Sequence, residues 1–185
     1  MPKNWLLNSN MTATNRTPQN TNFLQPTKFL FQLDRIASGQ FFCQSVNIPS
    51  INLGKAPINF PGLDVNAPGT KLEYGEFTMR FLIDENLQSW KDLHSWFRAI
   101  AAPTGTEERN YLTAVQNTYK NTKTAYSDGT LTILTALNNN NIRVSFFNMF
   151  PISLSEIQFD TSLSADDTIT ADATFAFDYF DITTA

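Results

Sequence analysis

The chain has 185 residues with a formal net charge of −4, and only 16% of its residues are charged. This length suits one domain with a hydrophobic core, and the few Lys and Arg residues exclude an extended basic surface for nucleic acid. The single cysteine excludes an intrachain disulfide, and no apolar run approaches the roughly 18 residues of a membrane span, so no membrane partner is expected.

Residues 1–27 are predicted to form an extended polar arm. The stretch NSNMTATNRTPQNTNFLQP is rich in polar and turn-forming residues and shows no helical or strand period. Trp5, Leu6 and Leu7 place an apolar tip on this polar tether. The tip either docks onto a neighbouring subunit or folds back on its own domain, and the sequence leaves both possibilities open.

A β domain is predicted over residues 28–185. Its first strand is expected over Lys28–Asp34, with Phe41–Asn47 as its hairpin partner after a turn at Gly39. Cys43 lies within the second apolar run. It is interpreted as a small buried hydrophobic residue rather than a reactive thiol.

Residues 48–75 are predicted to be a long loop, because four prolines and four glycines interrupt the stretch. Loops of this length are uncommon inside compact domains, and any strand containing these prolines should lie at a sheet edge. The loop is therefore expected to reach another subunit. The residues expected to make contacts between subunits are Trp5, Leu6 and Leu7 of the arm, with Pro49, Pro57, Phe60, Pro61, Leu63 and Tyr74.

A strand over Glu76–Ile83 and a helix over 86–102 follow. Apolar residues alternate in the strand and recur every three or four positions in the helix. Asn86 is the expected N-cap, and Pro103 ends the helix. The helix is expected to pack on one face of the sheet through Leu87, Trp90, Leu93, Trp96, Phe97 and Ile100, with Phe175 and Phe177 on the sheet.

The last third of the chain is predicted to contain three strands, after a loop over 104–127 with a possible helical turn. Leu131–Leu137 and Ile142–Met149 form a hairpin around four consecutive Asn residues, and Pro151 is expected to end its second strand. Apolar and polar residues then alternate without a break over Thr168–Phe180. A strand this long, roughly 40 Å, is typical of a barrel wall or of a sheet that continues into a neighbouring molecule.

No catalytic, metal or cofactor site is predicted, and the chain is not expected to be an enzyme. His94 is the single histidine and has no other ligand at metal-binding spacing. The adjacent carboxylates Asp84–Glu85 and Asp166–Asp167 are explained by helix capping and loop solvation. The sequence also lacks a phosphate-binding glycine loop and a Gly-x-Ser-x-Gly motif.

The order of these elements resembles the tail tube proteins of contractile-tailed bacteriophages, which are related in fold to the Hcp tube of type VI secretion. The likeness covers about residues 28–182 and is carried by FFCQSVNIP, IDENLQSWKDLHSWF, FPISLSEIQFD and ATFAFDYF. The resemblance implies an antiparallel β-barrel or sandwich with one flanking helix. It further implies hexameric rings of identical subunits, stacked into a hollow tube through which phage DNA passes.

The resemblance also implies a virion protein of the phage tail, assembled in the host cytoplasm, with tail sheath and baseplate proteins as partners. Its lumen is expected to be lined by the polar face of the last strand, including Thr170, Asp172 and Thr174. A tube-like hub, initiator or terminator protein would share the same core.

Two hypotheses outside this family remain. A monomeric β-sandwich that binds carbohydrate would expose aromatic residues such as Tyr74 or Tyr126. An enzyme would need a carboxylate pair with a shifted pKa in a pocket.

Overall fold

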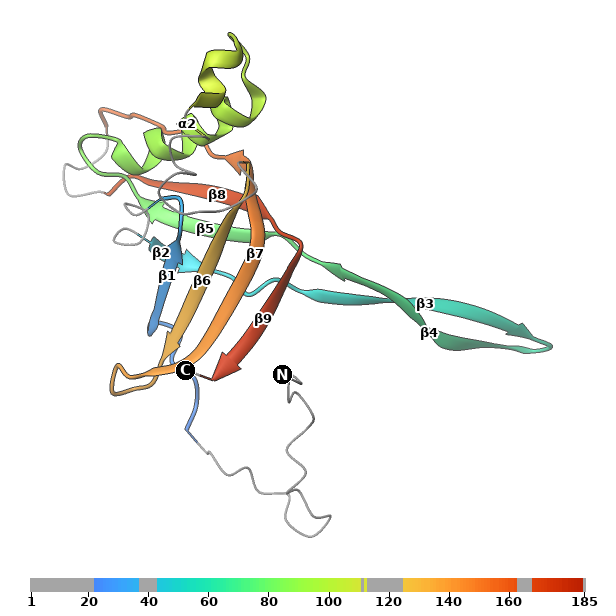
Figure 1. The fold of residues 1–185 in the computed structure, drawn as a ribbon. Helices are drawn as coiled ribbons and strands as arrows, with labels where there is room; N and C mark the ends of the chain where they lie inside the picture. The colour runs from blue at the N-terminus through green and yellow to red at the C-terminus, as the bar shows by residue number, and fades with distance from the viewer. Residues whose placement is uncertain (1–21, 37–42, 111, 113–124, 163–167, 185) are drawn as a thin grey trace.

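The computed structural model describes residues 22–36, 43–110, 112, 125–162 and 168–184. Trp5, Leu6 and Leu7 of the predicted arm lie outside the described residues. Two antiparallel sheets pack as a sandwich with one α-helix, and a two-stranded hairpin extends away from this body (Figure 1). The prediction of a mainly β fold with one helix is confirmed. In the described residues the strand path runs from β1 to β2 without pairing these two ends, so the sandwich is not a closed barrel.

Sheet A, as we name it, is the sheet that carries the chain's C-terminal strand. It contains, in spatial order, β1 (Phe29–Leu33), β6 (Ser127–Leu134), the first part of β7 (Asn140–Leu154) and β9 (Tyr179–Thr184). Alternation puts Phe31, Leu131 and Val144 on its inner face, where all three are buried. The predicted hairpin between β6 and β7 is confirmed, and Asn138 in its turn has a left-handed φ of 63°.

Sheet B, as we name it, is the sheet closer to the helix. It contains, in spatial order, the last part of β7, β8 (Thr170–Ala176), β5 (Phe77–Leu82) and β2 (Cys43–Val46). The prediction that Phe41–Asn47 pairs with the first strand is wrong, because β2 pairs with β5. The ladder partner of β1 is β6, and the buried Ile36 lies where the chain leaves β1 for the other sheet. Phe77 packs between the sheets, 4.8 Å from Phe31 and 4.9 Å from Phe146, measured between ring centroids.

The C-terminal ribbon is bent, so the prediction of one unbroken strand over Thr168–Phe180 is wrong. β8 ends at Ala176 and β9 begins at Tyr179. The predicted alternation holds along β8, where Phe175 is buried and its neighbours are half-buried. After the break the phase changes, because Phe180 is buried and Tyr179 is exposed.

A polar corner causes this bend. Asn148 on β7 adopts a φ of 55°, and its side-chain amide donates to the Asp178 carboxylate at 2.5 Å. The Asp178 backbone N–H donates to the Phe147 carbonyl at 3.1 Å. At this corner β7 and the β8–β9 ribbon therefore bend together, so that each lies in sheet B on one side of the corner and in sheet A on the other. The prediction that Pro151 ends the second strand of the hairpin is wrong, because β7 continues to Leu154. Pro151 lies beside an irregularity in the register, where the loss of a backbone N–H is tolerated.

Helix α2 (Gln88–Ala101) lies within the predicted range 86–102 and closes one side of the sandwich. The residues that it buries are Ser89, Leu93, Trp96 and Ala99. The Trp96 indole donates to the Ala125 carbonyl at 3.1 Å, and its ring lies 6.2 Å from Phe175. Asn86 is not the N-cap, because Leu87 occupies that position with a left-handed φ of 56°. The Asp84 carboxylate accepts the Gln88 backbone N–H at 2.8 Å. A short 3-10 turn, η1 (Thr106–Arg109), follows.

The stretch predicted to be a loop over 48–75 is mostly a hairpin. Its strands are β3 (Ile51–Phe60) and β4 (Leu63–Tyr74), and it projects from the body (Figure 1). Gly62 at the tip has a φ of 90°, a backbone conformation that this tight turn needs and that glycine adopts without strain. In the described part of the chain these two strands pair only with each other, so Pro57 and Pro68, the prolines that lie in strands, are on sheet edges, as predicted.

Candidate assembly surfaces

The hairpin β3–β4 exposes apolar side chains. Ile58 and Val65 are directly opposite each other, and Leu63 lies beyond them next to the turn. Their exposed fractions are 47%, 43% and 70%. Cross-strand neighbours share a face, so these side chains form one apolar face near the tip. This exposed apolar face is therefore a candidate for contact with another molecule.

The predicted contact residues fall on two parts of this hairpin. Pro57, Pro61 and Leu63 are exposed in its outer half. Pro49 is buried where the chain enters the hairpin, and Tyr74 is half-buried where the chain leaves it. These two residues therefore belong to the root of the hairpin, where it joins the body.

Sheet A has two unpaired edges in the described part of the chain. β1 pairs only with β6, and β9 pairs only with β7, on the opposite side of the sheet. β1 and β9 run in opposite directions, since three antiparallel pairings separate them. Placing β9 of one copy beside β1 of the next would therefore continue the antiparallel order.

The outer face of sheet A is mostly polar and close to neutral over two cross-strand rows, and its next row carries the stacked rings of Phe147 and Tyr179. Two cross-strand rows lie on it: Gln32, Thr130, Ser145 and Asp181, then Leu30, Thr132, Arg143 and Thr183. In these rows Arg143 and Asp181 are the charged residues, and their charges are opposite. Such a face would neither attract nor strongly repel a passing polyanion.

The predicted lumen residues Thr170, Asp172 and Thr174 lie on the outer face of sheet B, where all three are half-buried. Arg80 on β5 faces Asp172 and donates two hydrogen bonds to its carboxylate, at 2.8 and 3.0 Å. These hydrogen bonds lower the pKa of Asp172. The face therefore carries a paired charge among threonines and is also close to neutral.

The residues predicted to join helix and sheet divide into three groups. Leu93, Trp96 and Phe175 are fully buried together in the core. The half-buried members at its rim are Leu87, Trp90, Phe97 and Ile100. Phe177 lies elsewhere, in an aromatic cluster with Tyr74, Phe146 and Phe180 at the sheet corner.

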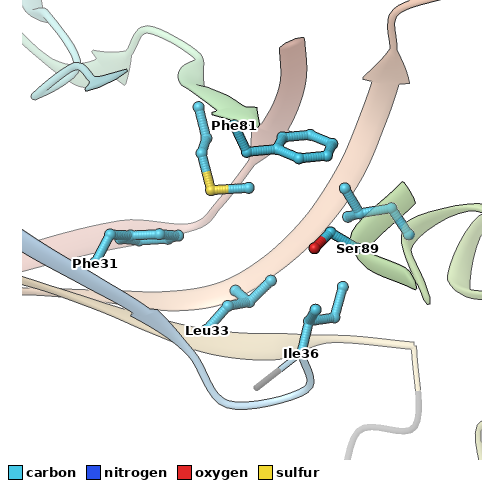
Figure 2. A pocket seen from close by; sticks show the side chains of 7 residues that line it. Phe31, Leu33, Ile36, Phe81 and Ser89 are labelled. Atoms are coloured by element: carbon cyan, nitrogen blue, oxygen red, sulfur yellow. The ribbon is translucent and has the colours of Figure 1, made fainter. Parts of the chain in front are cut away.

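A cavity of about 10 Å³ lies between the helix and the sandwich, and Figure 2 shows Phe31, Leu33, Ile36, Phe81 and Ser89 around it. This volume holds at most one water molecule, whereas binding pockets for small molecules are roughly 300–1,000 Å³.

His94 and Cys43 are the single histidine and the single cysteine of the chain. His94 stacks on Trp90 at 5.2 Å between ring centroids, and burial raises the pKa of the Cys43 thiol to about 11. In the described part of the chain, no three His, Cys, Asp or Glu residues are grouped as a metal site would require. None of the helices described there has the length and apolarity needed to cross a membrane.

Sequence reasoning missed two features of these surfaces. The edge strand β9 was hidden inside the apparent long strand, since the bend depends on Asn148, which is distant in sequence. The Asn residue at the end of β2, Asn47, carried no sequence signal, although its side chain bonds to β5.

Comparison with known proteins identifies related chains. A family model described as phage tail tube protein matches residues 8–183. The tail tube terminator protein of Enterobacteria phage T4 is 32% identical over 143 residues, which are 75% of this chain and 75% of that protein.

Solved structures share the fold at lower identity. The tube-terminating cap of the anti-feeding prophage has a TM-score of 0.65 and 16% identity, covering 95% of this chain and 100% of the cap chain. A chain of the sheath–tube complex of an extracellular contractile injection system, PVC, has a TM-score of 0.57 and 15% identity, covering 89% of this chain and 94% of that one.

Proposed function

The chain belongs to the phage tail tube protein family, and we propose that it ends the tube, as a ring of six copies that caps the last tube ring. The observation that carries this proposal is the similarity to the T4 tail tube terminator, which extends over three quarters of both chains. The fold that this chain shares with the anti-feeding prophage cap supports the same assignment.

The ring would close through the two free edges of sheet A. Head-to-tail pairing of β9 with the next copy's β1 uses different surfaces on the two partners, and such contacts form a closed ring when the rotation between copies permits it. Closure also removes the unpaired strand edges. The corresponding edge of sheet B, β2, has four residues and an irregular register, which makes it a poorer template.

The hairpin β3–β4 would hold this ring on the tube. Its apolar tip lies outside the body, so it can reach a subunit of the adjacent ring. A cap needs this attachment on one side only, because its other side must not bind a further tube ring.

The outer face of sheet A would line the lumen, with the outer face of sheet B, including Thr170, Asp172 and Thr174, as the alternative. Phage DNA would pass without specific binding, and the protein would act without catalysis or cofactor. It would be a virion component that is assembled in the host cytoplasm next to sheath proteins. Replacing Thr130 and Ser145 by Lys, or Thr170 and Thr174 by Lys, distinguishes the two faces, because only the pair in the lumen should impair DNA passage.

A growth assay separates a terminator from a main tube subunit. The purified protein should form rings but no long tubes alone, and it should stop growth when added to growing tubes, as seen by negative-stain electron microscopy. Polymerisation of the protein alone into long tubes would instead assign it to the main tube. A monomer that neither forms rings nor binds tube ends would contradict both assignments.

Cysteine crosslinking tests the ring contact directly. In a Cys43→Ala background, one cysteine at Gln32 and one at Asp181 share the outer face of sheet A at its two edges. Mild oxidation should give a ladder of products that ends at six copies. A matched pair at Ser45 and Asp181, which combines edges of different sheets, should give no ladder.

A further inference from the structure

Asn47 links the two segments of chain that enter and leave the hairpin β3–β4. It follows β2, and its side-chain amide donates to the Glu76 carbonyl at 3.0 Å. The Thr78 backbone N–H donates to the Asn47 side-chain oxygen at 2.7 Å, and the Asn47 backbone N–H donates to the Thr78 carbonyl at 3.3 Å. Both polar atoms of this side chain are therefore used, although the residue is exposed.

Other contacts also restrain the root of the hairpin, where its two strands join the body. The Gly75 N–H donates to the Ser50 carbonyl at 2.9 Å, and a Cβ on Gly75 would lie 2.7 Å from the Ser50 hydroxyl oxygen. The Tyr74 ring lies 5.7 Å from Phe177 and 5.3 Å from Phe180, between centroids. Where the chain leaves and re-enters the body, it is therefore held by the hydrogen bonds of Asn47 and Gly75 on one side and by the aromatic cluster around Tyr74 on the other.

We propose that Asn47 is a positioning residue that fixes the direction of the hairpin before the hairpin meets a partner. An exposed side chain adds little to the core, and these hydrogen bonds join the segments on the two sides of the hairpin, so they can restrain its direction. β4 has 12 residues, which span roughly 40 Å at about 3.3 Å per residue. A rotation of about 10° at the root would then move the tip by roughly 7 Å, well beyond the tolerance of a side-chain interface.

Spin-label distances in the isolated protein test this proposal without any assembly step. Labels at Asn59→Cys near the tip and Ala101→Cys on helix α2, in a Cys43→Ala background, report the angle between hairpin and body. Asn47→Ala should at least double the width of the distance distribution. Asn86→Ala, a matched loss of an exposed amide outside the hairpin, should leave it unchanged. An unchanged width in Asn47→Ala would overturn the proposal.

A variant that keeps only one of the two side-chain hydrogen bonds of Asn47 separates an effect on the direction of the hairpin from an effect on folding. Asn47→Asp keeps an oxygen for the Thr78 N–H but loses the donor to Glu76, so its distance distribution should be intermediate in width. The melting temperatures of all three variants should stay close to that of the parent protein. A large fall in the melting temperature of Asn47→Ala with a narrow distance distribution would show that Asn47 supports the fold and does not set the direction.

The consequence for assembly rests on the proposed capping function. Binding to tube ends should weaken about tenfold in Asn47→Ala, because the hairpin must be ordered again on binding. A broadened distribution with unchanged binding would confirm the positioning role and remove the hairpin from the capping contact. The distance distribution therefore tests the positioning role, and the binding measurement separately tests whether the hairpin takes part in capping.

Discussion

Replacing the apolar face of the hairpin tip with threonine should abolish capping and leave the body folded. The variant is Ile58→Thr, Leu63→Thr and Val65→Thr, which largely keeps strand propensity. Complete burial of such side chains is worth about 1.5–3 kcal/mol each, and roughly half of their surface is still exposed. Each substitution should therefore cost about 1 kcal/mol of docking free energy, or about 3 kcal/mol per subunit, which is about 100-fold in affinity.

Pelleting of the protein with preformed tubes measures this loss, and thermal melting measures the stability of the unbound protein. Because these side chains are outside the core, the melting temperature should change little. Asn59→Thr with Asn66→Thr is a matched control that alters the other face of the same strand pair, and it should bind normally. Full binding by the triple variant would refute the docking assignment, and a large loss of stability would show that the hairpin packs on its own body.

Three predictions concern the body. Trp96→Phe leaves the carbonyl of the half-buried Ala125 without its indole donor and should lower the free energy of unfolding by about 1–3 kcal/mol in urea titrations, whereas Trp90→Phe, with a longer bond of 3.5 Å, should lower it by less. Ser89 has a buried hydroxyl with no hydrogen-bond partner among the described residues, so Ser89→Ala should raise the melting temperature by a few degrees, and more than Ser95→Ala on the same helix does. Partial desolvation and the nearby Asp128 raise the pKa of Asp34, so this carboxyl group favours folding when protonated, and the contribution is lost as pH rises through the raised pKa. Asp34→Asn should therefore increase the urea midpoint at pH 7 but not at pH 3, and an equal gain at both would contradict this.

Local periodicity predicted the elements whose structure depends on neighbours in sequence. Alternation over Glu76–Ile83 gave β5 almost to the residue, and the apolar stripe over 86–102 gave α2. The four consecutive Asn residues predicted the turn between β6 and β7 to within a few positions, since it lies over 135–139 and Asn140 and Asn141 already belong to β7. In each case one buried face imposes the pattern, so the sequence period alone is informative.

The features that were missed depend on contacts between distant residues. The bend between β8 and β9 needs Asn148, which is 30 positions before Asp178. The pairing of β2 with β5 needs the chain to cross between sheets, which no local pattern records. The candidate surfaces show the same division: alternation placed Thr170, Asp172 and Thr174 together on one face, but which face would line the proposed lumen depends on the strand edges that are free.

The prolines of the hairpin bear on the docking role proposed for it. A two-stranded ribbon with exposed apolar residues could add to any open strand edge and aggregate. Pro57 on β3 and Pro68 on β4 each remove a backbone donor from the hairpin. With these donors absent, continuous strand addition along either edge is disfavoured, and contact through the apolar side chains remains. The hairpin therefore suits a partner with a shaped apolar surface, such as an adjacent ring, and resists indiscriminate pairing before assembly.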